Sequence, residues 1–260
     1  MQFKDQMNRT IRIEQHPKRI VSLVPSQTEL LFDLGLEKEV LGITKFCIHP
    51  NNWFRNKTRI GGTKNLNFEQ IEKLKPDLIL ANKEENTESE IKKLIKEYPV
   101  WISDIKNLED ALEFILLIGK MTNTNAKANS IINNIQKGFD KLTPLHKKKT
   151  SYFIWQDPMM SVNKNRFIHD MMIRCGFENI FATSDYDYPE ISEKQLQEAN
   201  PEIILLSSEP FPFKEKHIKQ FQKICPRAII KLVDGEMFSW YGSRLQYAAN
   251  YFQNLLKSIP

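Results

Sequence analysis

Short apolar runs alternate with amphipathic segments in both halves of the chain. Residues 19–24 form an apolar run rich in β-branched side chains, and residues 25–36 carry apolar positions at helical spacing. This region therefore predicts a strand, a turn and a helix. The alternation continues to residue 104 and resumes in residues 151–260. Repeated strand and helix patterns of this kind predict two α/β lobes, each with a mainly parallel sheet.

The first predicted helix carries sequence signals at both of its ends. Ser26 and Glu29 have the spacing of a capping box, in which the hydroxyl accepts a backbone N–H and the carboxylate reaches back. Gly35 suits a helix end because glycine adopts the left-handed conformation without steric cost. We therefore expect a helix that is capped by Ser26 and ends before Gly35.

A long helical pattern separates the two regions of alternation. Residues 108–142 carry apolar positions at helical spacing, interrupted near residues 122–125, and contain no strand pattern. A stiff helical connector between two lobes is the simplest interpretation. We expect an N-terminal lobe in residues 1–121, a connecting helix in residues 122–148 and a C-terminal lobe in residues 149–260.

The two predicted lobes share a local similarity in sequence. Residues 67–82 (NFEQIEKLKPDLILAN) and residues 192–208 (SEKQLQEANPEIILLSS) both read as a helix, a proline and a buried strand. Many α/β units place a proline there, but one copy in each half favours a pair of similar lobes. A cleft between two such lobes is a preferred ligand site. The matched pairs are Gln70 with Gln195, Ile71 with Leu196, Pro76 with Pro201, and Asp77 with Glu202.

Composition and charge narrow the class of protein. Hydrophobic residues make up 41% of the chain and charged residues 27%, as in globular proteins with a substantial core. The net charge of +5 is spread along the chain, and the run at residues 147–149 fits a solvated helix end, so no nucleic acid partner is expected. Three cysteines imply no disulfide framework. The N-terminal segment lacks the apolar core of an export signal, so the chain as written is expected to be cytoplasmic.

The common enzyme signatures do not occur in this sequence. There is no Walker-type phosphate loop, no G-x-G-x-x-G after the first strand, and no H-E-x-x-H, C-x-x-C or G-x-S-x-G. With 9 glycines, the chain has little material for a phosphate-cradling loop. The sequence predicts a small-molecule binding protein without intrinsic cofactor, and not an enzyme.

Cys47 and His49 follow the end of a predicted strand in the segment TKFCIHP. One interpretation is a thiol nucleophile with a histidine base, although C-x-H side chains on an extended segment are poorly placed for proton transfer. The favoured interpretation is a small apolar cysteine in the core and a histidine that contacts ligand. The other histidines lack metal-ligand spacing, so no protein-bound metal is expected.

Aromatic side chains gather in the predicted loops. Aromatic residues at strand ends beside charged side chains suit an amphipathic wall for a large flat ligand, whereas packing between lobes is the alternative for any single one of them. The residues expected to form this wall are Phe46, His49, Lys64, Trp155, Tyr188, Glu236, Trp240, Tyr241 and Arg244.

Five segments carry a resemblance to a known family: RIVSLVPSQTELLFDLG, VLGITKFCIHP, NFEQIEKLKPDLILA, CGFENIFA and SEKQLQEANPEIILL. Together they resemble the vitamin B12-binding proteins, within the helical-linker substrate-binding proteins of B12 and iron-chelate ABC transporters. The resemblance extends from about Arg19 to the final helix. It implies two α/β lobes joined by a long rigid helix, with a cleft that captures cobalamin, haem or an iron siderophore for an ABC permease. It also implies a periplasmic location, and we expect a monomer.

The resemblance also assigns individual residues. His49 stands where the B12 binders have tyrosine and Thr63 where they have tryptophan, so a related corrinoid, haem or chelated metal is expected as readily as B12 itself. The family docks its permease through one exposed glutamate on each lobe. Glu69 matches the first position, and Lys194 occupies the second with Glu193 beside it. The pocket positions implied in this way are His49, Thr63, Trp155, Tyr188, Glu236 and Trp240.

Two alternative functions remain at this point. A cytosolic ligand sensor or carrier could keep the fold without a permease, which the N-terminal segment and Lys194 favour. An enzyme that uses Cys47 with His49 is the third hypothesis.

Overall fold

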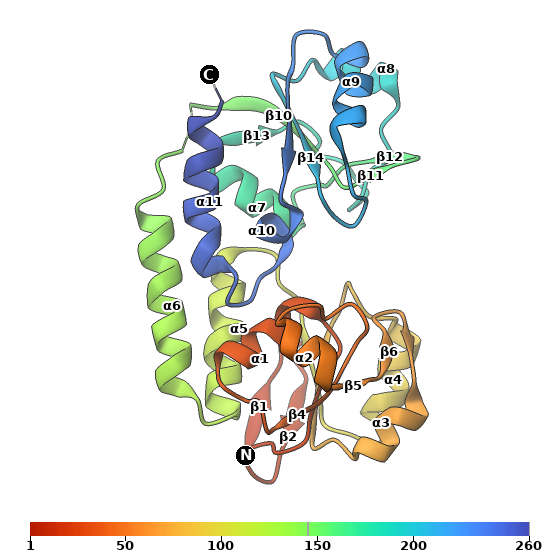
Figure 1. Cartoon of the computed structure of the whole chain (residues 1–260), viewed down its shortest axis with the longest axis vertical. Helices are drawn as coiled ribbons and strands as arrows, with labels where there is room; N and C mark the ends of the chain where they lie inside the picture. The colour runs from red at the N-terminus through yellow and green to blue at the C-terminus, as the bar shows by residue number, and fades with distance from the viewer. Residues whose placement is uncertain (145, 260) are drawn as a thin grey trace. The chain divides into compact units, whose positions relative to one another are not determined.

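The computed structural model describes residues 1–144 and 146–259, and these residues form two compact units (Figure 1). Leu145, inside the predicted connecting helix, and Pro260, at the end of the predicted C-terminal lobe, lie outside the described residues. Unit 1 consists of Met1–Ile105, Glu109–Asn134 and Tyr241–Arg244. Unit 2 consists of Lys106–Leu108, Ile135–Trp240 and the segment that begins at Leu245.

Unit 1 contains a five-stranded sheet in the order β5-β4-β3-β8-β9, and every pairing in it is parallel. All five residues of β8 are buried, as expected for a central strand covered on both faces. The strands of the unit are β1 (Gln2–Lys4), β2 (Thr10–Arg12), β3 (Ile20–Ser22), β4 (Val40–Ile43), β5 (Thr58–Arg59), β6 (Gly61–Gly62), β7 (Asn65–Leu66), β8 (Leu78–Asn82) and β9 (Val100–Ser103). Its first helices are α1 (Pro25–Asp33), α2 (Asn51–Asn56), α3 (Phe68–Leu74) and α4 (Glu88–Ile95).

The start of α1 differs from the prediction. The N-cap residue is Val24, without a side-chain cap, and Pro25 opens the helix, so the predicted capping box of Ser26 and Glu29 is wrong. Pro25 suits the first helical position because its missing N–H is not needed there. Gly35 does follow the helix end with a positive φ of 80°, as predicted.

Unit 2 contains a four-stranded parallel sheet in the order β13-β10-β14-β15. Its strands are β10 (Lys148–Phe153), β11 (Trp155–Gln156), β12 (Met159–Met160), β13 (Phe177–Asn179), β14 (Ile203–Ser207) and β15 (Ile229–Val233). Its helices are α7 (Phe167–Arg174), α8 (Glu193–Ala199), α9 (Glu215–Ile224), α10 (Gly235–Ser239) and α11 (Leu245–Lys257). The two main sheets confirm the predicted α/β class with mainly parallel strands.

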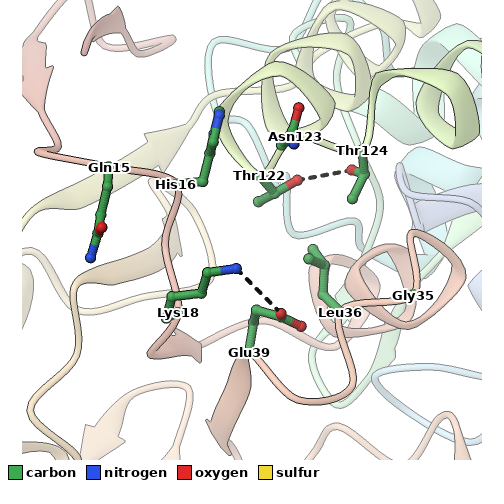
Figure 2. A pocket seen from close by; sticks show the side chains of 9 residues that line it. All are labelled: Gln15, His16, Lys18, Gly35, Leu36, Glu39, Thr122, Asn123 and Thr124. Carbon is green, nitrogen blue, oxygen red and sulfur yellow. Dashed lines mark hydrogen bonds and ion pairs between the residues drawn. The ribbon is translucent and has the colours of Figure 1, made fainter.

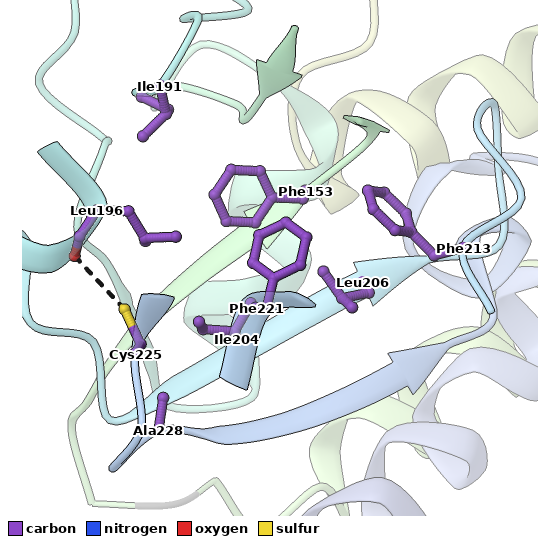
Figure 3. Close-up of a cluster of buried hydrophobic side chains, with 9 residues drawn as sticks. All are labelled: Phe153, Ile191, Leu196, Ile204, Leu206, Phe213, Phe221, Cys225 and Ala228. Carbon is purple, nitrogen blue, oxygen red and sulfur yellow. Dashed lines mark hydrogen bonds between the residues drawn. The ribbon is translucent and has the colours of Figure 1, made fainter. Parts of the chain in front are cut away.

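Successive side chains of β10 enter different layers of the unit 2 core. Phe153 joins the cluster that α8 and α9 cover, where its ring lies 4.9 Å from that of Phe221 (Figure 3). Tyr152 packs on the opposite face against Phe238 of α10, which in turn contacts Phe252 of α11. This alternation is the period of two that a strand requires, and it explains why β10 ends in two successive buried aromatic residues.

The predicted long helical region forms two helices, α5 (Leu108–Met121) and α6 (Asn125–Asp140). The break at residues 122–124 confirms the predicted interruption and contains Asn123 in a left-handed conformation, with a φ of 59°. The division between the units falls inside α6, after Asn134. No helix in residues 1–144 or 146–259 combines the length and apolarity needed to cross a bilayer.

The two similar segments, residues 67–82 and 192–208, have the same local structure in the two units. Asn67 caps α3 by accepting from Gln70 N, and Ser192 caps α8 by accepting from Gln195 N. Both helices end in a left-handed residue, Lys75 with a φ of 44° and Asn200 with a φ of 46°. A parallel strand follows in each case, as the sequence predicted.

Candidate functional site

Two of the predicted contacts of unit 1, Phe46 and His49, follow the carboxyl end of the parallel strand β4. Such ends meet at one edge of a sheet, which is the usual ligand position in α/β folds. The loop after β4 exposes two apolar side chains, Phe46 at 51% and Ile48 at 45%. Lys45 Nζ lies 5.2 Å from the centre of the Phe46 ring, and His49 is half-buried further along the loop. An exposed aromatic ring beside the Lys45 ammonium group can stack on a flat ligand.

Cys47 points away from this exposed surface. Its side chain is fully buried, and its Sγ lies 3.1 Å from the hydroxyl oxygens of Thr28 and Thr44. Burial raises the pKa of the Cys47 thiol. A catalytic cysteine needs an accessible thiolate, so this environment favours a structural role.

Arg244 and Tyr241 reach unit 1 from the C-terminal part of the chain. Arg244 donates from Nε and Nη2 to the two carboxylate oxygens of Glu29, at 2.9 and 2.7 Å, and both side chains are mostly buried. Tyr241 is also buried and donates its hydroxyl to Glu85 Oε1 at 3.3 Å. Both residues therefore have internal partners, and their roles as ligand contacts stay predictions.

Thr63 and Lys64 form the turn between β6 and β7. The Thr63 carbonyl accepts from the Asn86 side-chain amide at 2.9 Å, and the Lys64 carbonyl accepts from the Thr87 hydroxyl at 3.4 Å. The Lys64 side chain is exposed. The turn is thus held through its backbone, which leaves the Lys64 ammonium group available to a ligand.

In unit 2, Trp155 follows the carboxyl end of β10 and is 39% exposed. Its Nε1 donates to the Asp157 carbonyl at 3.0 Å, and its ring packs edge-on against Phe211 at 5.7 Å. These contacts fix the indole while part of its surface stays open. Tyr188 is half-buried, and the guanidinium of Arg166 lies 5.7 Å from the centre of its ring.

Glu209, which follows β14, is a residue that the sequence reasoning missed. Its Oε1 accepts from Trp240 Nε1 at 3.0 Å and from Ser239 Oγ at 2.6 Å. Burial, and to a lesser degree the charges of Glu236 and Asp234, raises the pKa of the Glu209 carboxyl. The sequence did contain a signal for this residue, because Glu209 lies two residues after the end of the buried strand β14. The loop after β4 was selected as a candidate site for the same reason, namely that it follows a strand end.

The predicted docking residues lie on the first turns of equivalent helices. Glu69 of α3 is exposed and pairs with Lys73, and Glu193 is the first residue of α8 and is also exposed. Relative to the capping residue, the position of Glu69 in α3 corresponds to that of Lys194 in α8. Glu69 and Lys194 both stand two residues after the capping residue, as the sequence alignment of the two segments predicted.

A separate cavity of about 380 Å³ lies in unit 1 near the turn between α5 and α6 (Figure 2). Its lining is mainly polar: Lys18 and Glu39 are 3.8 Å apart, and the hydroxyls of Thr122 and Thr124 share a hydrogen bond of 2.9 Å. None of the predicted ligand residues borders it. Within the described ranges, no group of three or more His, Cys, Asp or Glu side chains could hold a metal ion.

Two α/β units, each with a parallel sheet and an exposed aromatic side chain beyond a strand end, are typical of proteins that bind small molecules. The fold alone does not identify the ligand. The family follows from sequence: the chain belongs to the periplasmic binding protein family, whose model matches residues 20–224.

Named relatives of this chain are binding proteins. It is 23% identical over 250 residues to the vitamin B12-binding protein of Pectobacterium carotovorum, covering 94% of this chain and 90% of the relative. It is 26% identical over 213 residues to an uncharacterized ABC transporter substrate-binding lipoprotein of Bacillus subtilis, and this alignment covers 77% of this chain and 67% of the relative. The crystal structure of the periplasmic heme-binding protein HutB of Vibrio cholerae shares the fold, with a TM-score of 0.76 and 20% identity. The match covers 93% of this chain and 99% of HutB. The chain is thus a substrate-binding protein of the type that serves ABC transporters.

Proposed function

We propose that this protein reversibly captures a cobalamin-like corrinoid, haem or iron chelate and releases it, chemically unchanged, to an ABC permease. The observation that carries the proposal is the pair of exposed aromatic side chains, Phe46 and Trp155, each placed beyond the carboxyl end of a parallel strand in its own unit. Large flat ligands are recognised by such rings together with a few polar groups. The names of the relatives support the same ligand class.

Each unit would supply an aromatic surface and charged groups. Phe46, His49 and Lys64 would act from unit 1, and Trp155, Tyr188 and Glu236 from unit 2. We propose that a single ligand is held by both sets at once, as the family resemblance implies. Glu209 would serve indirectly, because its hydrogen bond to Trp240 fixes the orientation of that indole.

Delivery would use the exposed glutamates Glu69 and Glu193 at the starts of α3 and α8. Both carboxylates lie in the first turn of a helix and face solvent, so a basic partner surface can reach them. Lys194 beside Glu193 would make the second contact weaker than the first, since a like charge opposes an approaching arginine.

A spectroscopic titration tests this proposal. The purified chain is titrated with cobalamin, cobinamide, haem and a ferric siderophore while absorbance and tryptophan fluorescence are followed, with serum albumin as a control for nonspecific uptake. We expect saturable quenching by at least one ligand, at one equivalent per chain, and recovery of that ligand intact by mass spectrometry. Absence of saturable binding by all four ligands contradicts the proposal, and so does recovery of a chemically altered ligand.

A further inference from the structure

The solvent face of α9 carries a stripe of lysines. Lys216, Lys219 and Lys223 have the spacing i, i+3 and i+7, which places them on one side of a helix. All three are exposed, whereas His217 and Phe221 of the same helix are buried. Phe221 lies in the apolar cluster of unit 2 (Figure 3), and His217 packs against the rings of Phe211 and Phe213. The helix therefore packs with one face and presents a row of ammonium groups with the other.

These ammonium groups are not neutralised within the described part of the chain. None of the ion pairs among residues 1–144 and 146–259 involves Lys216, Lys219 or Lys223. Like charges three and four positions apart destabilise a helix. Burial lowers the pKa of His217, and the positive charges of Lys216 and Lys214 lower it further. The stripe thus costs α9 stability, and an anionic surface would relieve that cost.

The equivalent helix of unit 1 has a different charge pattern. α4 follows β8 as α9 follows β14, but it carries two glutamates, Glu88 and Glu90, before its two lysines, and Lys92 pairs with Glu88 at 2.6 Å. The Lys93 ammonium lies over the ring of Phe68 instead of standing free. The unneutralised stripe is therefore a feature of unit 2 and not of the repeated α/β unit.

The chemistry of the stripe fits lipid headgroups better than a protein partner. Lysine is a compact, strongly hydrated point charge, whereas specific recognition of carboxylates favours the planar fork of arginine. Lysine is also depleted in protein interfaces. A helix surface is convex and gives no pocket for an anchoring side chain, but it can lie along a diffuse layer of negative charge.

We propose that α9 binds an anionic lipid surface through Lys216, Lys219 and Lys223. Two further exposed cations, Lys214 at the N-cap of α9 and Arg227 after its C-terminus, extend the basic surface at both ends. Attraction to anionic lipids is worth about 1 kcal/mol per lysine near the membrane, so three lysines raise partitioning on the order of a hundredfold. This attraction weakens with salt.

Vesicle flotation with the ligand-free chain tests the proposal. We expect the chain to float with phosphatidylglycerol vesicles at low salt, to remain behind with phosphatidylcholine vesicles, and to be released by added salt. The triple variant Lys216→Glu, Lys219→Glu, Lys223→Glu should lose partitioning by a hundredfold or more.

The matched control is Lys38→Glu, Lys96→Glu, Lys120→Glu, which changes net charge equally at exposed positions of unit 1. This control should retain most of the partitioning. Equal loss in the two triple variants would show an effect of net charge alone and overturn the assignment to α9, as would failure of the parent chain to bind phosphatidylglycerol. Far-ultraviolet circular dichroism and urea denaturation of both variants check that they are folded.

Discussion

At the scale of single residues, Glu209 shows how unit 2 fixes the residues of its candidate site. One carboxylate oxygen of Glu209 accepts hydrogen bonds from both the Trp240 indole and the Ser239 hydroxyl, and the carboxylate is mostly buried. A hydrogen bond to a charged acceptor is stronger than one between neutral groups, so the indole is held firmly. The cost is that a carboxylate loses hydration, which raises the pKa of Glu209.

This cost leads to a prediction for the substitution Glu209→Gln. A carboxyl with a raised pKa binds its proton more tightly in the folded chain, so stability is greatest below the ordinary glutamate pKa and falls as pH rises above it. Glutamine keeps an oxygen that accepts both hydrogen bonds but does not titrate. We expect the variant to lose less stability than the parent between pH 4.5 and pH 7, and to have the higher free energy of unfolding at pH 7 in urea denaturation. A steeper fall in the variant would contradict the assignment.

The cysteines provide a second prediction at this scale. Cys47, Cys175 and Cys225 are all buried and reduced, and burial raises the pKa of each thiol. Because the thiolate is the reactive form, we expect none of the three to react with a thiol-specific reagent at pH 7 until the chain is unfolded. Mass spectrometry after short labelling checks this result. Rapid labelling of Cys47 in the folded chain would restore the hypothesis of a cysteine nucleophile.

At the scale of elements, the sequence predicted regular units better than their junctions. The elements at residues 67–82 and 192–208 were predicted because capping residues, a proline and an apolar strand lie close together in the chain. The missed capping at α1 has a different cause: Pro25 displaces Ser26 from the capping position, and Glu29 is engaged by Arg244, which is 215 positions away. Local patterns do not contain such long-range contacts.

The hairpin of β1 and β2 was also not predicted, because its strands have only three residues each. It is attached to the edge of the unit 1 sheet by Asp5, whose side chain is fully buried. This carboxylate accepts from the backbone N–H groups of Met7, Arg9 and Ile102, and from the Arg9 guanidinium at 2.6 Å. Arg9 in turn donates to the Val100 carbonyl in β9.

We therefore expect Asp5→Ala to destabilise unit 1 strongly. The substitution removes the acceptor of three backbone N–H groups and the charged partner of the Arg9 guanidinium, which costs about 3 kcal/mol. Urea denaturation measures the change. The control Glu14→Ala removes an exposed acid from the same region and should stay within about 0.5 kcal/mol of the parent. Equal effects of the two substitutions would show that Asp5 does not attach the hairpin.

At the scale of the whole molecule, the fold class followed from the sequence because alternation of strands and helices is a periodic signal that survives divergence. The two parallel sheets and the break between α5 and α6 were predicted in this way. The candidate site was predicted less completely, since strand ends can be located but side-chain partners cannot. Phe46 and Trp155 are exposed, whereas Arg244 and Tyr241 have half-buried partners, Glu29 and Glu85, that no local pattern indicated.

The central claim is that one ligand is bound by aromatic surfaces of both units, and equilibrium dialysis with matched variants tests it most directly. The parent chain, Phe46→Ser, Trp155→Ala and the control Tyr247→Ser, an exposed aromatic of α11, are dialysed against cobinamide, haem and a ferric siderophore. Loss of an aromatic contact costs about 1.5–3 kcal/mol, or roughly 10- to 100-fold in affinity.

The account predicts that the parent retains one of these ligands at one molecule per chain, that both site variants weaken its binding to this extent, and that Tyr247→Ser binds as the parent does. Retention of no ligand by the parent, or undiminished binding by both site variants, would contradict it.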